Sequence, residues 1–202
     1  MSADAAWADV LNTWFGESRE SVDGISSRMA WWFGSDSERD NELEHRYGSL
    51  CKAALSGQLN DWQKRAQSRL ALILLLDQFP RNLYRGTPGA FSGDDRAAML
   101  CLSGAHAGLD RKLEPVERIF FYMPLQHAED LVTQQVSVRL YEGLAAEQSG
   151  YPVFEGVVDY ARLHRDLVER FGRFPHRNEI LGRTSTEEEL KYLEDGGERF
   201  GQ

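Results

Sequence analysis

Apolar residues recur at helical spacing along almost the whole chain, and no alternating strand pattern extends beyond a few residues. The most apolar stretch, residues 68–79, carries apolar side chains from Leu70 to Leu76 on nearly every side of its predicted helix. A helix without a polar face is buried all round, so we expect this one to be central. The pattern predicts helices over residues 5–15, 37–56, 68–79, 95–108, 115–122, 124–148, 152–171 and from about residue 185 onward, with a short helix or turn over 59–66.

Proline, glycine and capping residues set the predicted helix boundaries. Pro80 should end the central helix, because proline disfavours helical geometry in the residue before it. Pro124 should precede the start of a new helix, and the aromatic run of residues 31–34 is interpreted as a plug within a connection. The last helix should begin with a capping box, formed either by Ser185 with Glu188 or by Thr186 with Glu189.

These elements predict an all-α fold of roughly eight to ten helices, packed as an antiparallel, tetratricopeptide-like or solenoid-like array. The chain shows no clear tetratricopeptide consensus at the repeat length of about 34 residues that such proteins use. No low-complexity tract or linker divides the sequence. We therefore predict a single helical domain over residues 1–202.

The composition limits the partners and the compartment that we expect for the protein, but it says little about the chemistry. The net charge of -9 repels a nucleic-acid backbone, so we expect no nucleic-acid partner. The longest apolar run is far shorter than the roughly 20 residues that cross a bilayer, and the acidic start lacks the basic segment of a secretory signal, so we expect no membrane association. Cys51 and Cys101 form no CxxC pair and lie in helix-like stretches, which favours reduced core thiols and a cytoplasmic protein.

A first polar segment interrupts an apolar context at residues 76–85. Asp77 falls in the last turn of the central helix, where the helix dipole disfavours a carboxylate and burial of an unpaired charge is costly. Asp77 therefore needs a cationic partner, and Arg81 is the natural one. We assign Asp77, Arg81 and Asn82 to ligand binding; the alternative is a buried salt bridge that locks the loop.

A second polar segment follows Pro124. His127 shares a predicted helical face with Asp130, and Glu129 is adjacent. A histidine oriented by a carboxylate is a general acid–base unit, so His127, Glu129 and Asp130 are candidate catalytic residues. The alternative is structural, because acidic residues are favoured in the first turn of a helix whatever their function.

A third polar segment, residues 170–183, places cationic and amide side chains between aromatics. Glycine and proline fix a tight bend there, which would aim several donors at one point, and such clusters suit phosphate or carboxylate ligands. The alternative is that these arginines pair with spare carboxylates, Asp77 included. The candidates are Arg173, Arg177, Asn178 and Arg183 for ligand binding and His176 for catalysis.

The first and third segments resemble each other. Residues 79–82 read Phe-Pro-Arg-Asn, and residues 174–178 read Phe-Pro-His-Arg-Asn. Each follows an apolar helix and is followed by a further arginine, so two similar helix exits are predicted to face each other across a pocket. Chance similarity is the competing explanation.

A metal site built from His127, Glu129, His164 and His176 is conceivable, because histidine and carboxylate ligands suit zinc or manganese. No HExxH motif or close histidine pair supports it, so we predict no metal ligand. His164 lies on an apolar helical stripe and is interpreted as a core histidine. Glycine-rich phosphate loops and GxSxG elbows are missing from the sequence, and no cofactor is indicated.

At these residues the chain resembles a bacterial family catalogued as domain of unknown function 924. The resemblance implies an all-α fold similar to tetratricopeptide-like helical superstructures and implies no activity. Ala128 stands where serine is more typical, which weakens any scheme with a hydroxyl there, and Arg39 stands where an aromatic residue is usual. The motifs that carry the resemblance are Trp14-Phe15-Gly16, Trp32-Phe33 with Asp36 and Asp40, residues 75–82 with 84–86, residues 121–125 with His127, Glu129 and Asp130, and residues 170–178 with 181–183.

Two functions are compatible with these features. In the first, the polar segments form a pocket for a small anionic molecule, and the histidines move a proton if the protein is an enzyme. In the second, the polar segments are buried structural salt bridges of a helical scaffold that binds a protein partner. The sequence does not decide whether there is catalysis, and it gives no oligomeric state.

Overall fold

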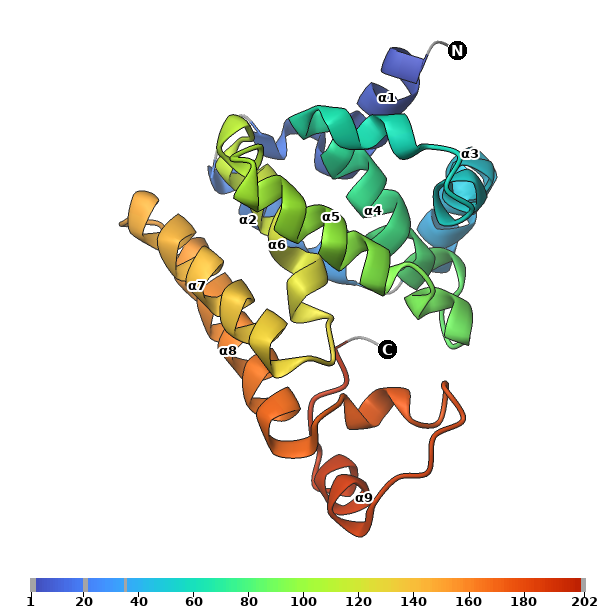
Figure 1. Cartoon of the computed structure of the whole chain (residues 1–202), viewed down its shortest axis with the longest axis vertical. Helices are drawn as coiled ribbons and strands as arrows, with labels where there is room; N and C mark the ends of the chain where they lie inside the picture. Colours follow the sequence, from blue (N-terminus) through green and yellow to red (C-terminus); the bar gives the residue numbers. More distant parts are fainter. Residues whose placement is uncertain (1–2, 20–21, 35, 201–202) are drawn as a thin grey trace.

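The computed structural model describes residues 3–19, 22–34 and 36–200, and within them the chain is helical with no strand (Figure 1). This confirms the predicted all-α fold; the tetratricopeptide-like arrangement stays a prediction. Short 3-10 helices join several of the longer elements. The α-helices of the described residues are α1 (Ala3–Phe15), α2 (Val22–Phe33), α3 (Ser37–Leu55), α4 (Ala66–Leu83), α5 (Asp94–His106), α6 (Pro115–Gln126), α7 (Leu131–Glu147), α8 (Pro152–Phe171) and α9 (Glu187–Glu194).

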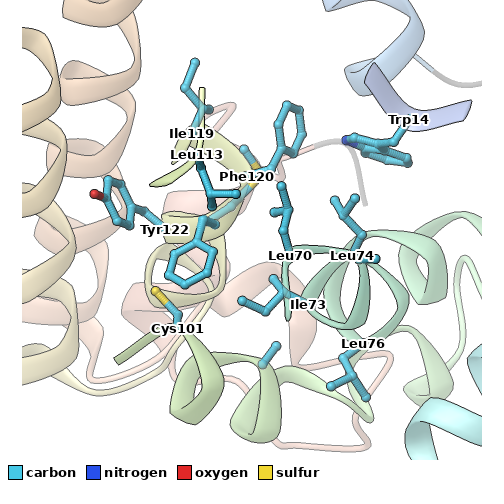
Figure 2. Packing of buried hydrophobic residues seen from close by; sticks show 14 of the residues in the cluster. Trp14, Leu70, Ile73, Leu74, Leu76, Cys101, Leu113, Ile119, Phe120 and Tyr122 are labelled. Carbon is cyan, nitrogen blue, oxygen red and sulfur yellow. The ribbon is translucent and has the colours of Figure 1, made fainter. Parts of the chain in front are cut away.

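Helix α4 is the centre of the fold, as its apolar sequence predicts. Every residue from Leu70 to Leu76 is fully buried, and α4 packs against α1, α3, α5 and α6. Figure 2 shows Leu70, Ile73 and Leu74 projecting from this helix into the core that also holds the ring of Phe120. Burying each such side chain contributes about 1.5–3 kcal/mol, so α4 is held firmly in the core, together with the polar residues at its C-terminal end.

The aromatic run at residues 31–34 was predicted to lie in a connection, and that prediction is wrong. Trp31 to Phe33 form the last turn of α2, an amphipathic helix whose apolar residues Ile25, Met29 and Trp32 are spaced three or four apart. The indole of Trp32 is buried and donates a hydrogen bond of 2.9 Å to the carbonyl oxygen of Trp14. The aromatic residues therefore fix α2 to the end of α1.

The predicted helix boundaries at the prolines are also wrong. Pro80 lies inside α4, which continues to Leu83, and Pro124 lies inside α6, so the next helix begins only at Leu131. Proline costs one hydrogen bond to the carbonyl four residues back, which for Pro80 is the carbonyl of Leu76. Gly93 packs against that carbonyl so closely that a Cβ on it would lie 2.2 Å from the oxygen. The carbonyl of Leu76, which Pro80 leaves without its helical hydrogen bond, is therefore the point of close contact between α4 and the start of α5.

Helices α7 and α8 pack side by side next to this core, and the chain beyond α8 folds back beneath it (Figure 1). Gly172 ends α8 in the left-handed conformation, with φ of 71°. Of the two capping boxes predicted for the last helix, the one that opens α9 is formed by Thr186 with Glu189. The C-terminal segment then returns toward the turn between α6 and α7, which brings residues 174–178 beside residues 127–130 and places the ring of Phe200 on His164.

Two further sequence predictions concern the cysteines and the membrane. Cys51 and Cys101 are both buried and form no disulfide, in agreement with the prediction of core thiols. No helix of the described ranges combines the length and the apolar character that crossing a membrane requires.

Candidate functional site

A cavity of about 470 Å³ opens between α2, α4, α6, α8 and the short 3-10 helix η5 (Pro175–Arg177). Both of the similar helix exits contribute to its wall, Arg81 and Asn82 from the first and His176 and Arg177 from the second. Its lining includes three arginines and three histidines but no aspartate or glutamate from the described residues. The lining residues are Met29, Trp32, Phe33, Gly34, Gln78, Arg81, Asn82, Arg85, Met123, Gln126, His127, Val153, Gly156, Val157, Tyr160, His164, His176, Arg177 and Phe200.

His127 and Asp77 form a tight pair at the inner end of the cavity. The Nδ1 atom of His127 lies 2.6 Å from Oδ1 of Asp77, which is fully buried. Burial favours the neutral carboxyl, but His127 and Arg81 outweigh it and hold the pKa of Asp77 well below its ordinary value. Burial and Arg81 lower the pKa of His127, against the opposing effect of Asp77. At neutral pH the imidazole therefore donates its Nδ1 hydrogen to Asp77, and Nε2 carries the lone pair.

Arg81 is fully engaged with two carboxylates. Its Nη1 lies 3.1 Å from Oδ1 of Asp77, and its two terminal nitrogens make a bidentate pair with Asp94 at 2.8 and 2.9 Å. Burial lowers the pKa of Arg81, but Asp94 and Asp77 more than compensate and raise it. The predicted pairing of Arg81 with Asp77 is present, and Arg81 has little capacity left for a ligand.

Arg177 is buried but poorly paired. Its Nη1 donates to the carbonyl oxygen of His127 at 3.0 Å and to Oδ2 of Asp94 at 3.4 Å. Nε is buried without a hydrogen-bond partner among the described residues, and both hydrogen bonds that Arg177 donates to them come from Nη1. The guanidinium carbon lies 4.7 Å from the ring centre of Phe91 and 4.6 Å from that of Phe174, which holds the group in place.

The surroundings of Arg177 disfavour its charge. Burial, followed by the nearby Arg81, lowers the pKa of Arg177 to about 10, despite the opposing effects of Asp94 and Glu129. A guanidinium that is buried and incompletely paired is costly for the folded protein. An anion in the cavity would supply the missing partner.

Two more histidines complete the polar side of the cavity. His164 is buried and lies 2.8 Å through Nδ1 from the carbonyl oxygen of Tyr160, and its ring stacks on Phe200 at 3.8 Å. Burial lowers the pKa of both His164 and His176 to about 3. His176 has a buried Nδ1 with no hydrogen-bond partner in the described part of the chain. Both rings are therefore neutral at physiological pH.

Several candidate residues from the sequence lie outside the cavity wall. Glu129 does not orient His127; it accepts hydrogen bonds from Arg183 at 2.9 Å and from the backbone N–H of Phe174 at 2.7 Å. Asp130 caps α7 by accepting from the N–H of Thr133 at 2.8 Å, because the chain between α6 and α7 is a turn and not the helical face that was predicted. These two carboxylates stabilise structure around the site and do not face His127.

The third polar segment divides in the same way. Arg173 pairs with Glu189 at 2.6 Å, and Asn178 donates to Glu189 at 3.2 Å and accepts from Arg183 at 2.9 Å. These side chains tie the segment to α9. Of the ligand-binding candidates from this segment, only Arg177 lines the cavity, with His176 beside it. The expected convergence of all the arginines on one point is not observed.

Sequence reasoning missed Asp94 and Gln78, whereas the interpretation of His164 as a core histidine is confirmed by its burial and its hydrogen bond to Tyr160. Asp94 was not among the candidate site residues from the sequence, yet its carboxylate binds both Arg81 and Arg177 across the packing of α4 against α5. Gln78 donates to Oδ2 of Asp77 at 2.5 Å and lines the cavity. Only the position of Gln78 directly after Asp77 could have indicated its role. No group of three or more metal-ligating side chains occurs among the residues that the structure describes.

Comparison with known proteins gives the relationship of the chain but no activity. Residues 10–197 match the model of a family described as bacterial protein of unknown function (DUF924). The fold is similar to the structure of the protein of unknown function ATU0120 from Agrobacterium tumefaciens, with a TM-score of 0.81, 37% sequence identity, and coverage of 96% of this chain and 100% of that one. No curated protein matches the chain significantly.

Proposed function

The chain belongs to the bacterial family of unknown function DUF924, and from that premise we propose that the protein binds a small anionic molecule in the cavity between α4, α6, α8 and η5. The anionic group, a carboxylate or phosphate, contacts Arg177 and lies within reach of Asn82 and His176. Small-molecule sites are typically concave, largely apolar cavities of about 300–1,000 Å³ with a few convergent polar groups, and this cavity fits that description.

The unsatisfied guanidinium of Arg177 is the observation that carries the proposal. A buried arginine normally has its donors occupied, because an unpaired donor in the interior costs roughly 1–3 kcal/mol, and more when it is charged. Arg81, which is equally deep in the fold, has two carboxylate partners, whereas Arg177 has one at 3.4 Å. No carboxylate of the described residues lines the cavity, although the chain as a whole has a net charge of -9. The charged groups that line the cavity are thus all cationic, and the carboxylates that pair with them, Asp77, Asp94 and Asp40, lie behind its wall.

The Asp77–His127 pair gives the proposed site an acid–base group. With Nδ1 bonded to Asp77, Nε2 of His127 can take a proton from the bound molecule or from a water beside it, and Asp77 stabilises the imidazolium that forms. The low pKa of His127 keeps this nitrogen unprotonated at neutral pH, as a general base requires. We therefore propose that the protein is an enzyme whose reaction includes proton transfer at His127.

One observation favours the alternative of a protein-binding helical scaffold. Arg173 and Arg183 act as internal struts toward Glu189 and Glu129, as that hypothesis requires of the polar segments. The struts surround the cavity and do not fill it, and they leave Nε of Arg177 without a hydrogen-bond partner among the described residues. The small-molecule function accounts for both facts and is preferred.

The compartment is part of the proposal. Two buried thiols without a disulfide suit the reducing cytoplasm, where we expect the protein to act.

Isothermal titration calorimetry with butanoate, benzoate and phenyl phosphate tests the binding function. Loss of a charge-assisted hydrogen bond costs about 1.5–3 kcal/mol, so Arg177→Gln should weaken the best of these probes about ten- to hundredfold. Arg173→Gln is the matched control, because that arginine lies in the same segment but pairs with Glu189 outside the cavity. If no probe binds the native protein, or if Arg177→Gln and Arg173→Gln bind equally well, the proposal is wrong.

A further inference from the structure

We infer that the anion taken by this cavity is amphiphilic, with one carboxylate or phosphate at the Arg177 end and an uncharged apolar chain or ring that extends between α2 and α8. This inference rests on the proposed function and adds the chemical class of the ligand.

The cavity is divided into a polar and an apolar half. One wall, which we call the inner wall, is formed by α4 with Arg85 that follows it, by the end of α6 and by η5, and it carries the arginines, the amides, His127 and His176. The other wall, which we call the outer wall, is formed by Met29, Trp32 and Phe33 of α2 and by Val153, Val157 and Tyr160 of α8, none of which is charged. His164, farther along α8, adds a neutral ring. A ligand that satisfies only the inner wall leaves the outer wall in contact with water.

The apolar wall is unusually open to solvent. Met29 is 37% exposed, Phe33 is 50% exposed and Tyr160 is 46% exposed, although each is a large apolar side chain. Exposed apolar residues that are scattered singly need no explanation, but a group that lines a concave surface marks a binding site. An apolar ligand body would remove this surface from water and gain about 25 cal/mol for each Å² buried.

A helical glycine keeps the outer part of the cavity open. Gly156 lies within α8, lines the cavity and has no atom within 4 Å of the position that a Cβ would take. Packing therefore does not require glycine there, and glycine in a helix costs about 1 kcal/mol relative to alanine. A larger side chain at this position would project into the space that we assign to the apolar part of the ligand.

The dimensions favour a ligand larger than a small anion. A cavity of about 470 Å³ is much larger than a phosphate ion or an acetate ion needs. A charged second end is disfavoured, because the outer wall offers it no charged partner and removing a charge from water without one is costly. One charged end and one apolar end match the two walls.

A chain-length series tests this inference by calorimetry. The probes are acetate, butanoate, hexanoate and octanoate, with octyl phosphate to distinguish a phosphate from a carboxylate head and octyltrimethylammonium to provide the same chain on a cation. Burial of each methylene should raise the affinity about fourfold, so octanoate should bind far more tightly than butanoate, and the cation should not bind at this site.

Two glycine variants locate the chain in the cavity. Gly156→Leu should abolish most of the gain from butanoate to octanoate while butanoate still binds. Gly143→Leu is the matched control, because Gly143 is also an exposed helical glycine with nothing within 4 Å of where a Cβ would lie, but it belongs to α7, outside the cavity. The control variant should show the same gain in affinity from acetate to octanoate as the native protein.

The outcomes separate the two proposals. Equal affinity for all chain lengths, with Arg177→Gln still weakening every probe, would overturn the amphiphilic ligand and leave the anion site intact. A strong dependence on chain length that is the same in Arg177→Gln would overturn the anion site. Equal loss in Gly156→Leu and Gly143→Leu would also contradict the assignment of the apolar wall.

Discussion

Acid should destabilise this protein in a range where most of its carboxylates do not yet titrate, because two buried histidines of the cavity wall stay unprotonated in the folded state. Burial is the main cause that lowers the pKa of His164 to about 3, and His127, Arg177 and His176 lower it further, against the hydrogen bond to the carbonyl of Tyr160. The pKa of His176 is also about 3, from burial and then from the neighbouring cations. In the unfolded chain a histidine titrates near pH 6.5. Below that pH the unfolded state binds protons that the folded state does not, so the free energy of unfolding falls as the pH falls.

The magnitude follows from the two pKa values. Each histidine removes about 1.4 kcal/mol of stability per pH unit between pH 6.5 and pH 3. Between pH 7.5 and pH 5.0 this amounts to about 2 kcal/mol for each, or about 4 kcal/mol for His164 and His176 together. Carboxylates with a lowered pKa, such as Glu189 at about 2, lose their contribution only as the pH falls below the value of the unfolded chain, near 4.3. Carboxylates of this kind therefore contribute little within the window, whereas Glu117, whose pKa is raised by burial, acts in the opposite direction to the histidines. A loss of this size is a large part of the roughly 5–15 kcal/mol that stabilises a typical domain.

Urea unfolding at pH 7.5, 6.5 and 5.0 measures the effect. The native protein should lose about 4 kcal/mol across the range, to which the lowered pKa of His127 adds in the same direction, and His164→Gln should lose about 2 kcal/mol less than the native protein, whatever its absolute stability. His106→Gln is the control, because His106 is exposed at the end of α5, and it should keep the dependence of the native protein. A flat profile for the native protein, or an unchanged slope in His164→Gln, would refute the reasoning.

Three further substitutions test the structure around the site. Asp77→Asn should lower the free energy of unfolding by about 1–3 kcal/mol, since it removes the charged acceptor shared by Arg81 and the imidazole of His127 while Arg81 keeps its pair with Asp94, and chemical denaturation measures this loss. Gly93→Ala should destabilise the protein by about 1–3 kcal/mol, because its Cβ would lie 2.2 Å from the carbonyl oxygen of Leu76; a melting temperature equal to that of the native protein would contradict the close contact. Glu129→Gln should weaken the bond to Arg183 and speed amide hydrogen exchange over residues 172–183, whereas unchanged exchange would show that this pair does not hold the segment.

The fold was largely predictable from the sequence because it depends on a pattern of apolar residues. The run from Leu70 to Leu76 identified the central helix, and the glutamate that follows Thr186 identified the start of α9. The helix boundaries predicted at the prolines were wrong, because the low helix propensity of proline is a local effect that tertiary packing can outweigh. Pro80 and Pro124 both lie in the final turns of helices whose packing outweighs one lost hydrogen bond.

The site was only partly predictable, because ion pairs depend on distances between helices that spacing along the chain does not give. Arg81 and Arg177, one from each of the two similar helix exits, line the same cavity, but the role of that cavity as a site stays a prediction. The partner of His127 was sought among its sequence neighbours Glu129 and Asp130, whereas it is Asp77, fifty positions earlier. A carboxylate that follows a histidine closely in sequence is free to turn away from it when the connecting residues form a turn.

The guanidinium of Arg177 is the most direct reporter of the proposed site. In a nitrogen-15 NMR titration with octanoate, the Nε–H signal of Arg177 should shift and saturate together with binding, while the corresponding signal of Arg173 stays in place. If octanoate binds and the Arg177 signal does not move, the anion lies elsewhere and the account of the cavity is wrong.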